Sequence, residues 1–396
     1  MNADPLLLRA IEAHKGGRLA EAEVGYRRVL RRRPHDADAL NFLGMLRFHR
    51  GDPAAAAELL QKAVQALPTN PHAWVNLGNV LLARDDAEGA KAALVKATEL
   101  APELPMAWFN LGVCLRRFKL PHDAASCFHQ ALKLEPGYGP AYDALGVLLY
   151  RLGRYDEAAS VYRDWLTYHP GDPIARHMLA AVTGENAPVR ADDAYVTATF
   201  DKFAESFDEN LQELGYRAPQ LLAERLGALA EKAATLDVLD AGCGTGLCGP
   251  LLRPFARTLA GVDLSPGMVQ RARAREVYDE LAVQELCAFM RSRPASFDLV
   301  ISADTLCYFG ALEEPLAAAR ECLRRDGWLA FTLERLEPAA AGDYRIEPHG
   351  RYSHDEAYVC RALAAAGFVK CEATHASLRR ERGADVQGIL ASASAT

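Results

Sequence analysis

The sequence predicts an α-helical repeat array followed by a doubly wound α/β domain whose sheet is mostly parallel. Three observations support this prediction: similar residues recur every 34 positions in the first half, strands and helices alternate in the second half, and a glycine-rich turn follows an apolar run that ends in an acid. With 396 residues, the chain is long enough for two or three domains. We expect the array over residues 1–184, with five repeats and a capping helix, a linker over 185–194 and the α/β domain over 195–396.

The composition is that of a globular protein, with 50% hydrophobic and 24% charged residues. The net charge of −7 does not favour nucleic acid or anionic membranes as general partners. No window approaches the roughly 20 apolar residues that a membrane span needs, and the first residues lack the basic segment of a signal peptide. The nine cysteines show neither a disulfide framework nor the spacing of a metal site. We therefore expect a cytoplasmic protein with no metal, no nucleic-acid partner and no membrane association.

Five copies of a 34-residue unit make up the first half. Four columns of residues keep this spacing: Pro34, Pro68, Pro102, Pro136 and Pro170; Ala10, Gly44, Gly78, Gly112 and Gly146; Ala22, Ala56, Ala90, Ala124 and Ala158; and Tyr26, Leu60, Leu94, Phe128 and Tyr162. Small side chains allow two helices to cross closely, a large one fills the gap beside them, and each proline ends a second helix. Because one unit cannot bury its apolar face alone, the copies must stack.

Residues 74–78 and 108–112 closely match the first-helix signature of the tetratricopeptide repeat, and the array resembles that family. The resemblance implies a concave face formed by the first helix of each repeat. Its side chains would be Asn41, Phe48, His49, Asn79, Phe109, Arg116, Arg117, Tyr150 and Arg151. Such a groove would bind a peptide or an acidic segment; alternatively, the array would serve self-association and give a homo-oligomer.

The second half alternates strands and helices. From Tyr195, apolar and aromatic residues at near-helical spacing predict a helix over 193–212, and another helix follows Pro219. Ser265 and Pro266 fit the N-cap and the first position of a later helix. Strands are predicted over 236–240, 258–263, 297–302 and 328–333, helices over 247–252 and 313–323, and a closing hairpin-like pair over 368–373 and 386–391.

The turn after the first strand carries the clearest functional signal. Asp240 is followed by glycines at alternate positions, Gly242, Gly244 and Gly246, and the next strand ends at Asp263. Glycines let the backbone approach a ligand closely, and the helix that follows aims its N–H groups at it. A carboxylate at the end of the second strand can accept hydrogen bonds from two ribose hydroxyls. The pattern is typical of a site for a cofactor that contains a nucleoside.

The same turn also fits the G-x-G-x-x-G pattern of dinucleotide sites, over residues 244–249. That pattern alone is a weak signal. Asp240 would repel a pyrophosphate, whereas the ammonium group of S-adenosylmethionine fits an acidic, glycine-rich turn. S-adenosylmethionine is therefore the expected cofactor, and a nicotinamide cofactor is the alternative.

Residues 195–396 resemble the class I S-adenosylmethionine-dependent methyltransferases, which have a Rossmann-like fold. The whole chain resembles bacterial predicted methyltransferases that carry tetratricopeptide repeats. The resemblance implies that Asp263 binds the ribose and that Glu285, where the family often has aspartate, accepts a hydrogen bond from the adenine amino group. The full set of implied cofactor-binding residues is Tyr195, Asp240, Gly242, Gly244, Gly246, Asp263, Leu264, Met268, Glu285, Leu286 and Asp304.

The acceptor side is less clearly marked. Methyl transfer needs the donor and the acceptor to be aligned, and it needs a base only if the acceptor loses a proton. The candidates follow the fourth and fifth strands or lie in a polar insertion over 335–355, which is long enough for a lid or binding loop. They are Tyr308 and His354 as catalytic groups, and Glu334, Arg351 and Tyr352 as acceptor-binding groups. His354 could be the base, but Ser353 also fits the N-cap of a helix that starts there, and Arg351 also fits a structural ion pair.

The sequence thus predicts an S-adenosylmethionine-dependent methyltransferase whose acceptor binds through the repeat groove and the 335–355 insertion. A protein or peptide acceptor is slightly favoured over a small metabolite. Arg379, Arg380 and Arg382, with Glu381, are interpreted as ordinary ion pairs near the closing turn. The alternatives are a catalytically inactive scaffold that binds S-adenosylmethionine and a nicotinamide-dependent oxidoreductase.

Overall fold

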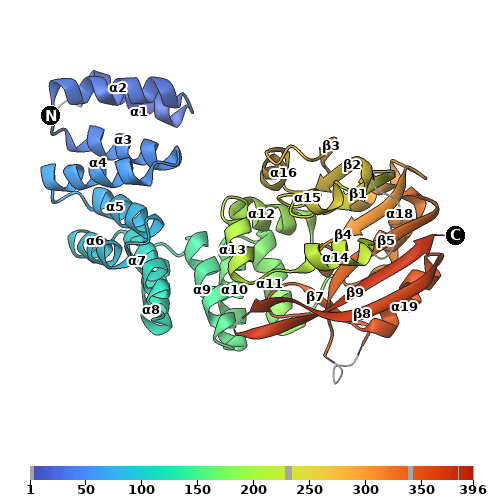
Figure 1. The fold of residues 1–396 in the computed structure, drawn as a ribbon. Helices are drawn as coiled ribbons and strands as arrows, with labels where there is room; N and C mark the ends of the chain where they lie inside the picture. Colours follow the sequence, from blue (N-terminus) through green and yellow to red (C-terminus); the bar gives the residue numbers. More distant parts are fainter. Residues whose placement is uncertain (1–3, 228–233, 338–341, 382, 396) are drawn as a thin grey trace. The chain divides into compact units, whose positions relative to one another are not determined.

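A computed structural model describes residues 4–227, 234–337, 342–381 and 383–395. The chain divides into two compact units, Met1–Pro170 and Gly171–Thr396. The first unit is built from helices, and the second contains a sheet with helices packed against it (Figure 1). Over the described ranges, no helix has the length and apolar character needed to cross a membrane.

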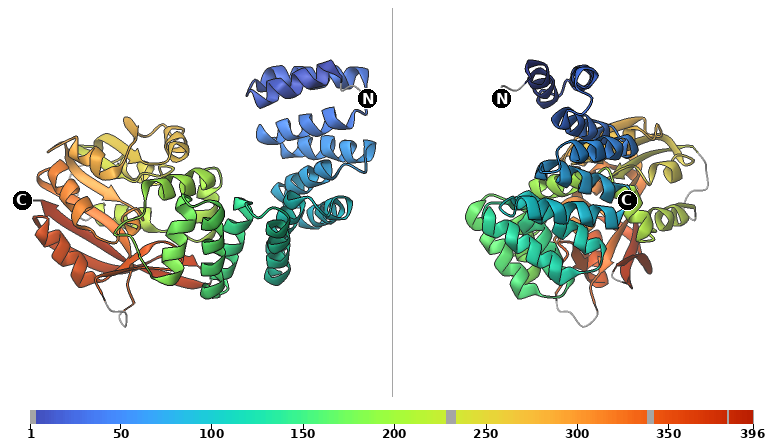
Figure 2. Two further views of the ribbon diagram at one scale, coloured as in Figure 1. Left: turned by 180° about the vertical axis from the view of Figure 1, so that it is seen from behind. Right: turned by 90° about the vertical axis from the view of Figure 1, so that its left-hand side faces the viewer.

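The first unit is an array of helix pairs, one pair for each 34-residue repeat, as predicted. In Figure 2 the pairs formed by α1 to α8 lie one beside the next. The helices are α1 (Pro5–Lys15), α2 (Leu19–Arg32), α3 (Ala37–His49), α4 (Pro53–Ala66), α5 (Pro71–Ala83), α6 (Ala87–Leu100), α7 (Pro105–Arg117), α8 (Pro121–Leu134), α9 (Gly139–Arg151) and α10 (Tyr155–Tyr168).

Contacts within each helix pair explain the 34-residue columns. A Cβ atom on Gly112 would lie 2.6 Å from the Phe128 ring and 3.1 Å from the Ala124 carbonyl oxygen. One repeat earlier, a Cβ on Gly78 would lie 2.5 Å from Leu94. The small residue of the first helix therefore receives the large residue of the second, and this close approach fixes how the two helices cross.

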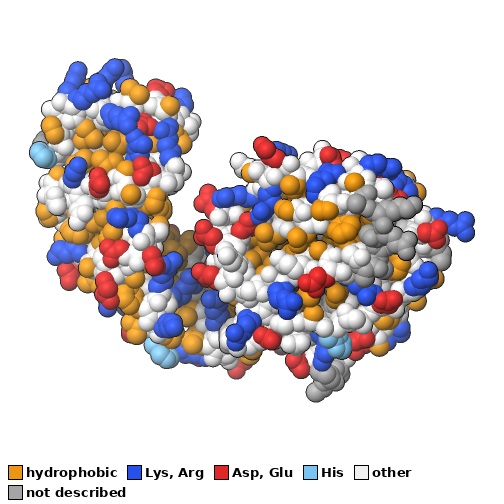
Figure 3. All heavy atoms as spheres, viewed as in Figure 1, with side chains coloured by type: hydrophobic (Ala, Val, Ile, Leu, Met, Phe, Trp, Pro, Cys, Tyr) orange, Lys and Arg blue, Asp and Glu red, His pale blue; other side chains and the backbone are white. Residues whose placement is uncertain are grey.

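Lys and Arg side chains gather over α1 and α2 (Figure 3). Arg33, at the end of α2, is bonded to Asp4 at 2.7 Å and to Asp36 at 3.0 Å. The exposed Lys and Arg side chains lie near a helix C-terminus, where positive charge is favourable. Neighbouring acids neutralise part of this charge.

The second unit is organised around a mostly parallel sheet, which confirms the predicted doubly wound domain. The order β3-β2-β1-β4-β5 is parallel throughout, and β9 pairs antiparallel with both β5 and β8. The strands are β1 (Leu236–Ala241), β2 (Ala256–Asp263), β3 (Glu280–Val283), β4 (Phe297–Ser302), β5 (Leu323–Arg335), β6 (Tyr344–Ile346), β7 (Tyr352–His354), β8 (Phe368–Glu381) and β9 (Ala384–Ala395).

Helices cover both faces of this sheet (Figures 1 and 2). Leu239 packs in one core with Phe289 and Leu316, while its neighbour Val238 packs in a second core with Leu252. Successive residues of a strand point to opposite faces, so both faces of β1 are buried. From residue 218 on, the helices of the unit are α14 (Ala218–Gly227), α15 (Gly249–Leu252), α16 (Pro266–Arg273), α17 (Leu286–Arg291), the 3-10 helix η1 (Leu306–Tyr308), α18 (Glu313–Cys322) and α19 (Glu356–Ala365).

The helix expected to cap the array belongs to the second unit. It is α11 (Pro173–Thr183), and the boundary between the units falls at residue 170 rather than 184. The His177 ring stacks on the Tyr195 ring at 3.8 Å between centroids, and His177 Nε2 lies 2.7 Å from the Gly350 carbonyl oxygen. These buried contacts hold α11 against α12 (Asp193–Phe203) and the 335–355 insertion.

The single helix predicted over 193–212 is wrong, because the chain forms α12 and then α13 (Phe207–Glu213), with a turn between them. Asp201 in α12 accepts hydrogen bonds from Ser265 and Gly267. Asp208 in α13 instead accepts from Thr245 and Arg275. The two carboxylates are held by different loops of the sheet, and the turn lets each helix meet its own partners.

Two short strands, β6 and β7, occupy the insertion between β5 and α19. The prediction that Ser353 caps the next helix is wrong: Ser353 lies in β7, and Asp355 caps α19 by accepting from the Tyr358 N–H at 2.9 Å. β7 pairs with the end of β5 through Glu334 and Arg335. The insertion is thereby anchored to the sheet beside the carboxyl end of β5.

Replacing Gly112 with alanine should destabilise the array. The new Cβ would overlap Phe128 and the Ala124 carbonyl oxygen, so we expect a net loss of about 1–2 kcal/mol in the free energy of unfolding after the better helix propensity of alanine is counted. Urea denaturation followed by circular dichroism measures this loss. Gly137→Ala is the control, because the nearest atom to its Cβ would lie 3.8 Å away; equal stability of the two variants would contradict the packing account.

Candidate functional site

A cavity lies at the carboxyl ends of the parallel strands in the second unit. It is lined by residues 242–245 after β1, Asp263 and Leu264 after β2, residues 284–286 after β3 and residues 303–305 after β4. The carboxyl ends of parallel strands meet at one edge of a sheet, so segments that are distant in sequence converge here. The sequence predicts a ligand site at this edge.

The turn after β1 needs glycine for two separate reasons. Gly242 has φ of +79°, and a Cβ there would lie 2.2 Å from Thr305 Oγ1. Its N–H and that of Cys243 donate to the Val262 carbonyl oxygen at 2.8 and 2.9 Å. The end of β2 thus holds the turn in a conformation in which its backbone faces the cavity without an intervening side chain.

Asp263 connects the turn to the start of α16. Its Oδ2 accepts from the Gly244 N–H at 2.9 Å, and its Oδ1 accepts from the Ser265 N–H at 2.9 Å. Burial raises the pKa of Asp263, and these hydrogen bonds oppose that shift. Each carboxylate oxygen has a second lone pair, so Asp263 can hold the turn and still accept hydrogen bonds from a ligand.

Asp240 and Gly246, both predicted to contact the cofactor, lie behind the turn and do not line the cavity. The Tyr278 hydroxyl donates to Asp240 Oδ2 at 2.6 Å, and Oδ1 makes no hydrogen bond to any described residue. Burial raises the pKa of Asp240 to about 7. In this arrangement Asp240 supports the turn from beneath, and direct contact with a ligand stays a prediction.

The side of the cavity near β3 carries apolar walls and one ion pair. Leu264 and Leu286 line it, whereas Met268, another predicted apolar contact, is buried in α16 away from the lining. Glu285 caps α17 by accepting from two backbone N–H groups, and it meets Arg190 Nη1 at 3.3 Å. The carboxylate predicted to bind adenine is therefore already engaged, and the sequence analysis missed Arg190 beside it.

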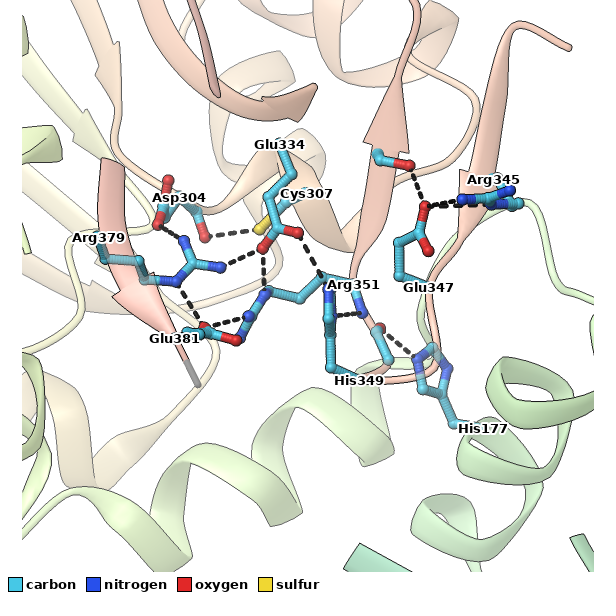
Figure 4. Close-up of polar contacts among 12 residues, drawn as sticks. His177, Asp304, Cys307, Glu334, Arg345, Glu347, His349, Arg351, Arg379 and Glu381 are labelled. Carbon is cyan, nitrogen blue, oxygen red and sulfur yellow. Dashed lines mark hydrogen bonds and ion pairs between the residues drawn. The ribbon is translucent and has the colours of Figure 1, made fainter. Parts of the chain in front are cut away.

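Five charged side chains form an ion-pair cluster at the other end of the cavity (Figure 4). Arg379 bonds Asp304 at 2.6 Å, Glu381 at 2.7 Å and also Glu334. Arg351 bonds Glu334 at 2.5 Å and Glu381 at 2.6 Å. The members come from β8, from the end of β5, from the loop after β4 and from the insertion, so the cluster joins four separate parts of the unit.

The cluster favours the charged forms of Glu334 and Glu381 despite their burial. Burial alone would raise the pKa of Glu381, but Arg351 and Arg379 lower it to about 2. Burial likewise opposes ionisation of Glu334, and Arg351 and His349 hold the pKa of Glu334 well below its usual range. Asp304 differs: its burial outweighs the nearby Arg379, and its pKa is raised.

The predicted acceptor-side residues are only partly brought together. Tyr308 and Arg351 line the cavity. Glu334 is only 4% exposed and does not line the cavity, but it contacts Arg351 and Arg379, which do. Tyr352 is fully buried, and its hydroxyl donates to the Pro188 carbonyl oxygen at 2.6 Å.

His354 lies in the protein interior rather than in the cavity. It is fully buried, and its Nε2 is 2.9 Å from the Phe309 carbonyl oxygen and 3.1 Å from that of Gly310. Burial lowers its pKa to about 4. A buried neutral imidazole that already binds backbone cannot reach an acceptor, so the structure does not favour His354 as a base. Tyr195 is also outside the lining, since it stacks on His177.

The cavity is covered by the aromatic segment that follows Tyr195. Phe200 and Phe207 from α12 and α13, and Tyr216 after them, line it together with two leucines, Leu211 and Leu214. The apolar spacing of this segment was visible in the sequence, but it is equally typical of core packing. The structure places the segment beside the glycine turn, where a Cβ on Gly244 would lie 4.0 Å from the Phe207 ring.

Comparison with known proteins identifies both parts of the chain. A family model described as "Cilia and flagella-associated protein 70 C-terminal domain" matches residues 3–214, and a model described as "Methyltransferase domain" matches residues 239–331. The chain is 36% identical over 113 residues to human Methyltransferase-like protein 27, covering 27% of this chain and 45% of that protein.

Two further likenesses cover the two parts separately. Malonyl-(acyl-carrier protein) O-methyltransferase of Acetivibrio thermocellus is 36% identical over 107 residues, which is 26% of this chain and 37% of that protein. The chain thus spans less than half the length of either of these two relatives. The solved structure titled "Functional Characterization of Pseudomonas Aeruginosa pilF" is similar with a TM-score of 0.42 and 22% identity, covering 51% of this chain and 90% of that one.

The acid stability of the second unit should depend on Glu381. Because its folded pKa of about 2 lies below the ordinary value of 4.5, its contribution is present above pH 4.5 and is lost as the pH falls towards 2. We expect that loss to be about 3 kcal/mol in the free energy of unfolding. Urea denaturation between pH 7 and pH 2.5 should show a smaller acid loss for Glu381→Gln than for the unaltered chain; parallel pH curves would contradict the ion-pair account.

Proposed function

The chain belongs to the family described as the cilia and flagella-associated protein 70 C-terminal domain and carries a class I methyltransferase domain after its tetratricopeptide repeats, and we propose that it transfers a methyl group from S-adenosylmethionine to an acceptor. The observation that carries this proposal is the carboxylate of Asp263, which lines the cavity at the end of β2 and is bonded to the Gly244 N–H of the glycine turn.

The residues of the cavity fit S-adenosylmethionine. Asp263 offers free lone pairs for ribose hydroxyls, and Leu264 and Leu286 offer apolar surface for an adenine ring. The turn at Gly242 and Gly244 brings backbone close enough for a carboxylate and an ammonium group to bind. When bound, the cofactor supplies a methyl carbon that the adjacent sulfonium has already activated.

The protein's part in the reaction is alignment and exclusion of water. The Phe200 and Phe207 side chains cover the cavity, and Tyr308 stands among the lining residues near the ion-pair cluster. Burial raises the pKa of Tyr308 well above its usual value, so its hydroxyl stays protonated and can orient an acceptor by hydrogen bonding but cannot take up a proton at neutral pH. We infer an acceptor whose reacting atom needs no strong base.

A nicotinamide dinucleotide fits the cavity less well. Its pyrophosphate would need the N-terminus of a substantial helix, and α15 has only four residues. The acidic side chain of Asp240 lies directly beneath the turn. The glycine turn and Asp263 are both intact, which also favours a working enzyme over a scaffold that has lost its activity.

For the repeat array we propose recruitment of the acceptor, with a protein or peptide favoured over a free small metabolite. The array stacks five helix pairs, and such stacks commonly present extended binding surfaces. Incubation of the full chain with a lysate and methyl-labelled S-adenosylmethionine should place label in a protein or peptide fraction. Absence of label from every fraction, with the cofactor bound, would favour the inactive scaffold.

Asp263→Asn should weaken the binding of S-adenosylhomocysteine by about 1–3 kcal/mol, because a hydrogen-bonded charged group is lost. Isothermal titration calorimetry measures this change. Glu280→Gln is the control, since Glu280 lies on β3, pairs with Arg293 at the surface and does not line the cavity. Unchanged affinity in Asp263→Asn would refute the assignment of the ribose site.

Removing the array should separate cofactor binding from acceptor recruitment. Because α11 packs within the second unit, the truncation should begin at Gly171 rather than after residue 184. Residues 171–396 should bind S-adenosylhomocysteine as the full chain does, yet transfer less label to lysate acceptors. Equal labelling by the truncated and full chains would rule out recruitment by the repeats.

A further inference from the structure

The ion-pair cluster leaves two atoms unused where it faces the cavity. All three guanidinium nitrogens of Arg379 are taken, by Asp304, Glu334 and Glu381. Arg351 uses Nε for Glu334 and Nη2 for Glu381 Oε1. Among described residues, Arg351 Nη1 and Glu381 Oε2 have no hydrogen-bond partner, and both side chains line the cavity.

These two atoms belong to side chains that contact each other, and they have fixed hydrogen-bonding roles. The residues are bonded to each other at 2.6 Å, so Nη1 and Oε2 belong to one charge pair. Burial opposes the charge of Arg351, but Glu334 and Glu381 outweigh it and its pKa is raised well above the usual range. The pKa of Glu381 is about 2. At every ordinary pH, Arg351 can therefore only donate and Glu381 can only accept.

The charge balance of the cluster limits what can bind there. Three carboxylates, from Asp304, Glu334 and Glu381, face the guanidinium groups of Arg351 and Arg379, and His349 also contacts Glu334 at 3.2 Å. The Arg351 charge is already paired with two acids, Glu334 and Glu381. An incoming carboxylate would meet the negative charge of Glu381 and would offer it no hydrogen.

We propose that Arg351 and Glu381 form the polar end of the acceptor subsite and select an acceptor that carries a carboxamide. The carbonyl oxygen of such a group would accept from Arg351 Nη1, and its N–H would donate to Glu381 Oε2. A peptide bond or an Asn or Gln side chain has this chemistry, as does a small amide. The amide is the recognised group, and the methylated atom is a different part of the acceptor.

The other cluster members act as positioning residues. Glu334 and Arg379, 4% and 3% exposed, hold the two recognition side chains from behind (Figure 4). Gly350, which precedes Arg351, is fixed from the opposite side by His177 of α11 at 2.7 Å. The donor and acceptor are thus rigid before any ligand arrives, which lowers the entropic cost of binding.

The inference rests on the proposed function, and fragment binding can test it without the natural acceptor. Benzamide and benzoate are titrated into the full chain, with saturating S-adenosylhomocysteine, by ligand-observed magnetic resonance. We expect benzamide to bind at least about tenfold more tightly than benzoate, because benzoate leaves Glu381 without a donor. Glu381→Gln should reduce this preference to near unity, since glutamine can donate as well as accept.

Glu372→Gln is the matched control, because Glu372 lies on the same strand β8 but is 57% exposed and pairs with Arg225. It should keep the full preference for benzamide. Equal binding of the two fragments, tighter binding of benzoate, or no binding of either would overturn the proposal, and so would an unchanged preference in Glu381→Gln. Affinity for S-adenosylhomocysteine, measured on the same samples, reports separately on the proposed function.

Discussion

The carboxylate of Asp263 connects two parts of the second unit that form the candidate site, the glycine turn and the start of α16. It accepts from Gly244 on one side and from Ser265 on the other, while the neighbouring Val262 carbonyl accepts from the first two residues of the turn. The end of β2 therefore sets the shape of the turn after β1, and Gly242 is required because any side chain would meet Thr305. The wall of the cavity at this edge of the sheet depends on this junction.

Much of the fold could be predicted because its determinants are local or periodic. The 34-residue period indicates close contacts such as that of Gly112 with Phe128, and apolar runs flanked by turns indicate the buried strands of the parallel sheet. The split between α12 and α13 could not be predicted, since it arises from Asp201 and Asp208 bonding to different loops of the sheet. The boundary before α11 depends likewise on a long-range contact.

The candidate site also has one part that could be predicted from the sequence and one part that could not. The turn and Asp263 could be predicted because one short segment contains nearly all of their geometry. The ion-pair cluster is assembled from Asp304, Glu334, Arg351 and Arg379, which lie on four segments. In the sequence, Arg379 and Glu381 resemble ordinary surface ion pairs near a closing strand, and only the fold shows that they are held inside a cavity wall. His354, attractive as a base by its residue type, is fully buried.

We propose above all that the glycine turn and Asp263 hold S-adenosylmethionine, with the ion-pair cluster in the wall of the same cavity. A crystal structure of the full chain with S-adenosylhomocysteine tests it most directly. The account predicts both ribose hydroxyls on Asp263, the amino-acid part over the turn and the sulfur facing Tyr308 and Arg351. A nucleoside bound elsewhere, or one that leaves Asp263 without contact, would contradict it.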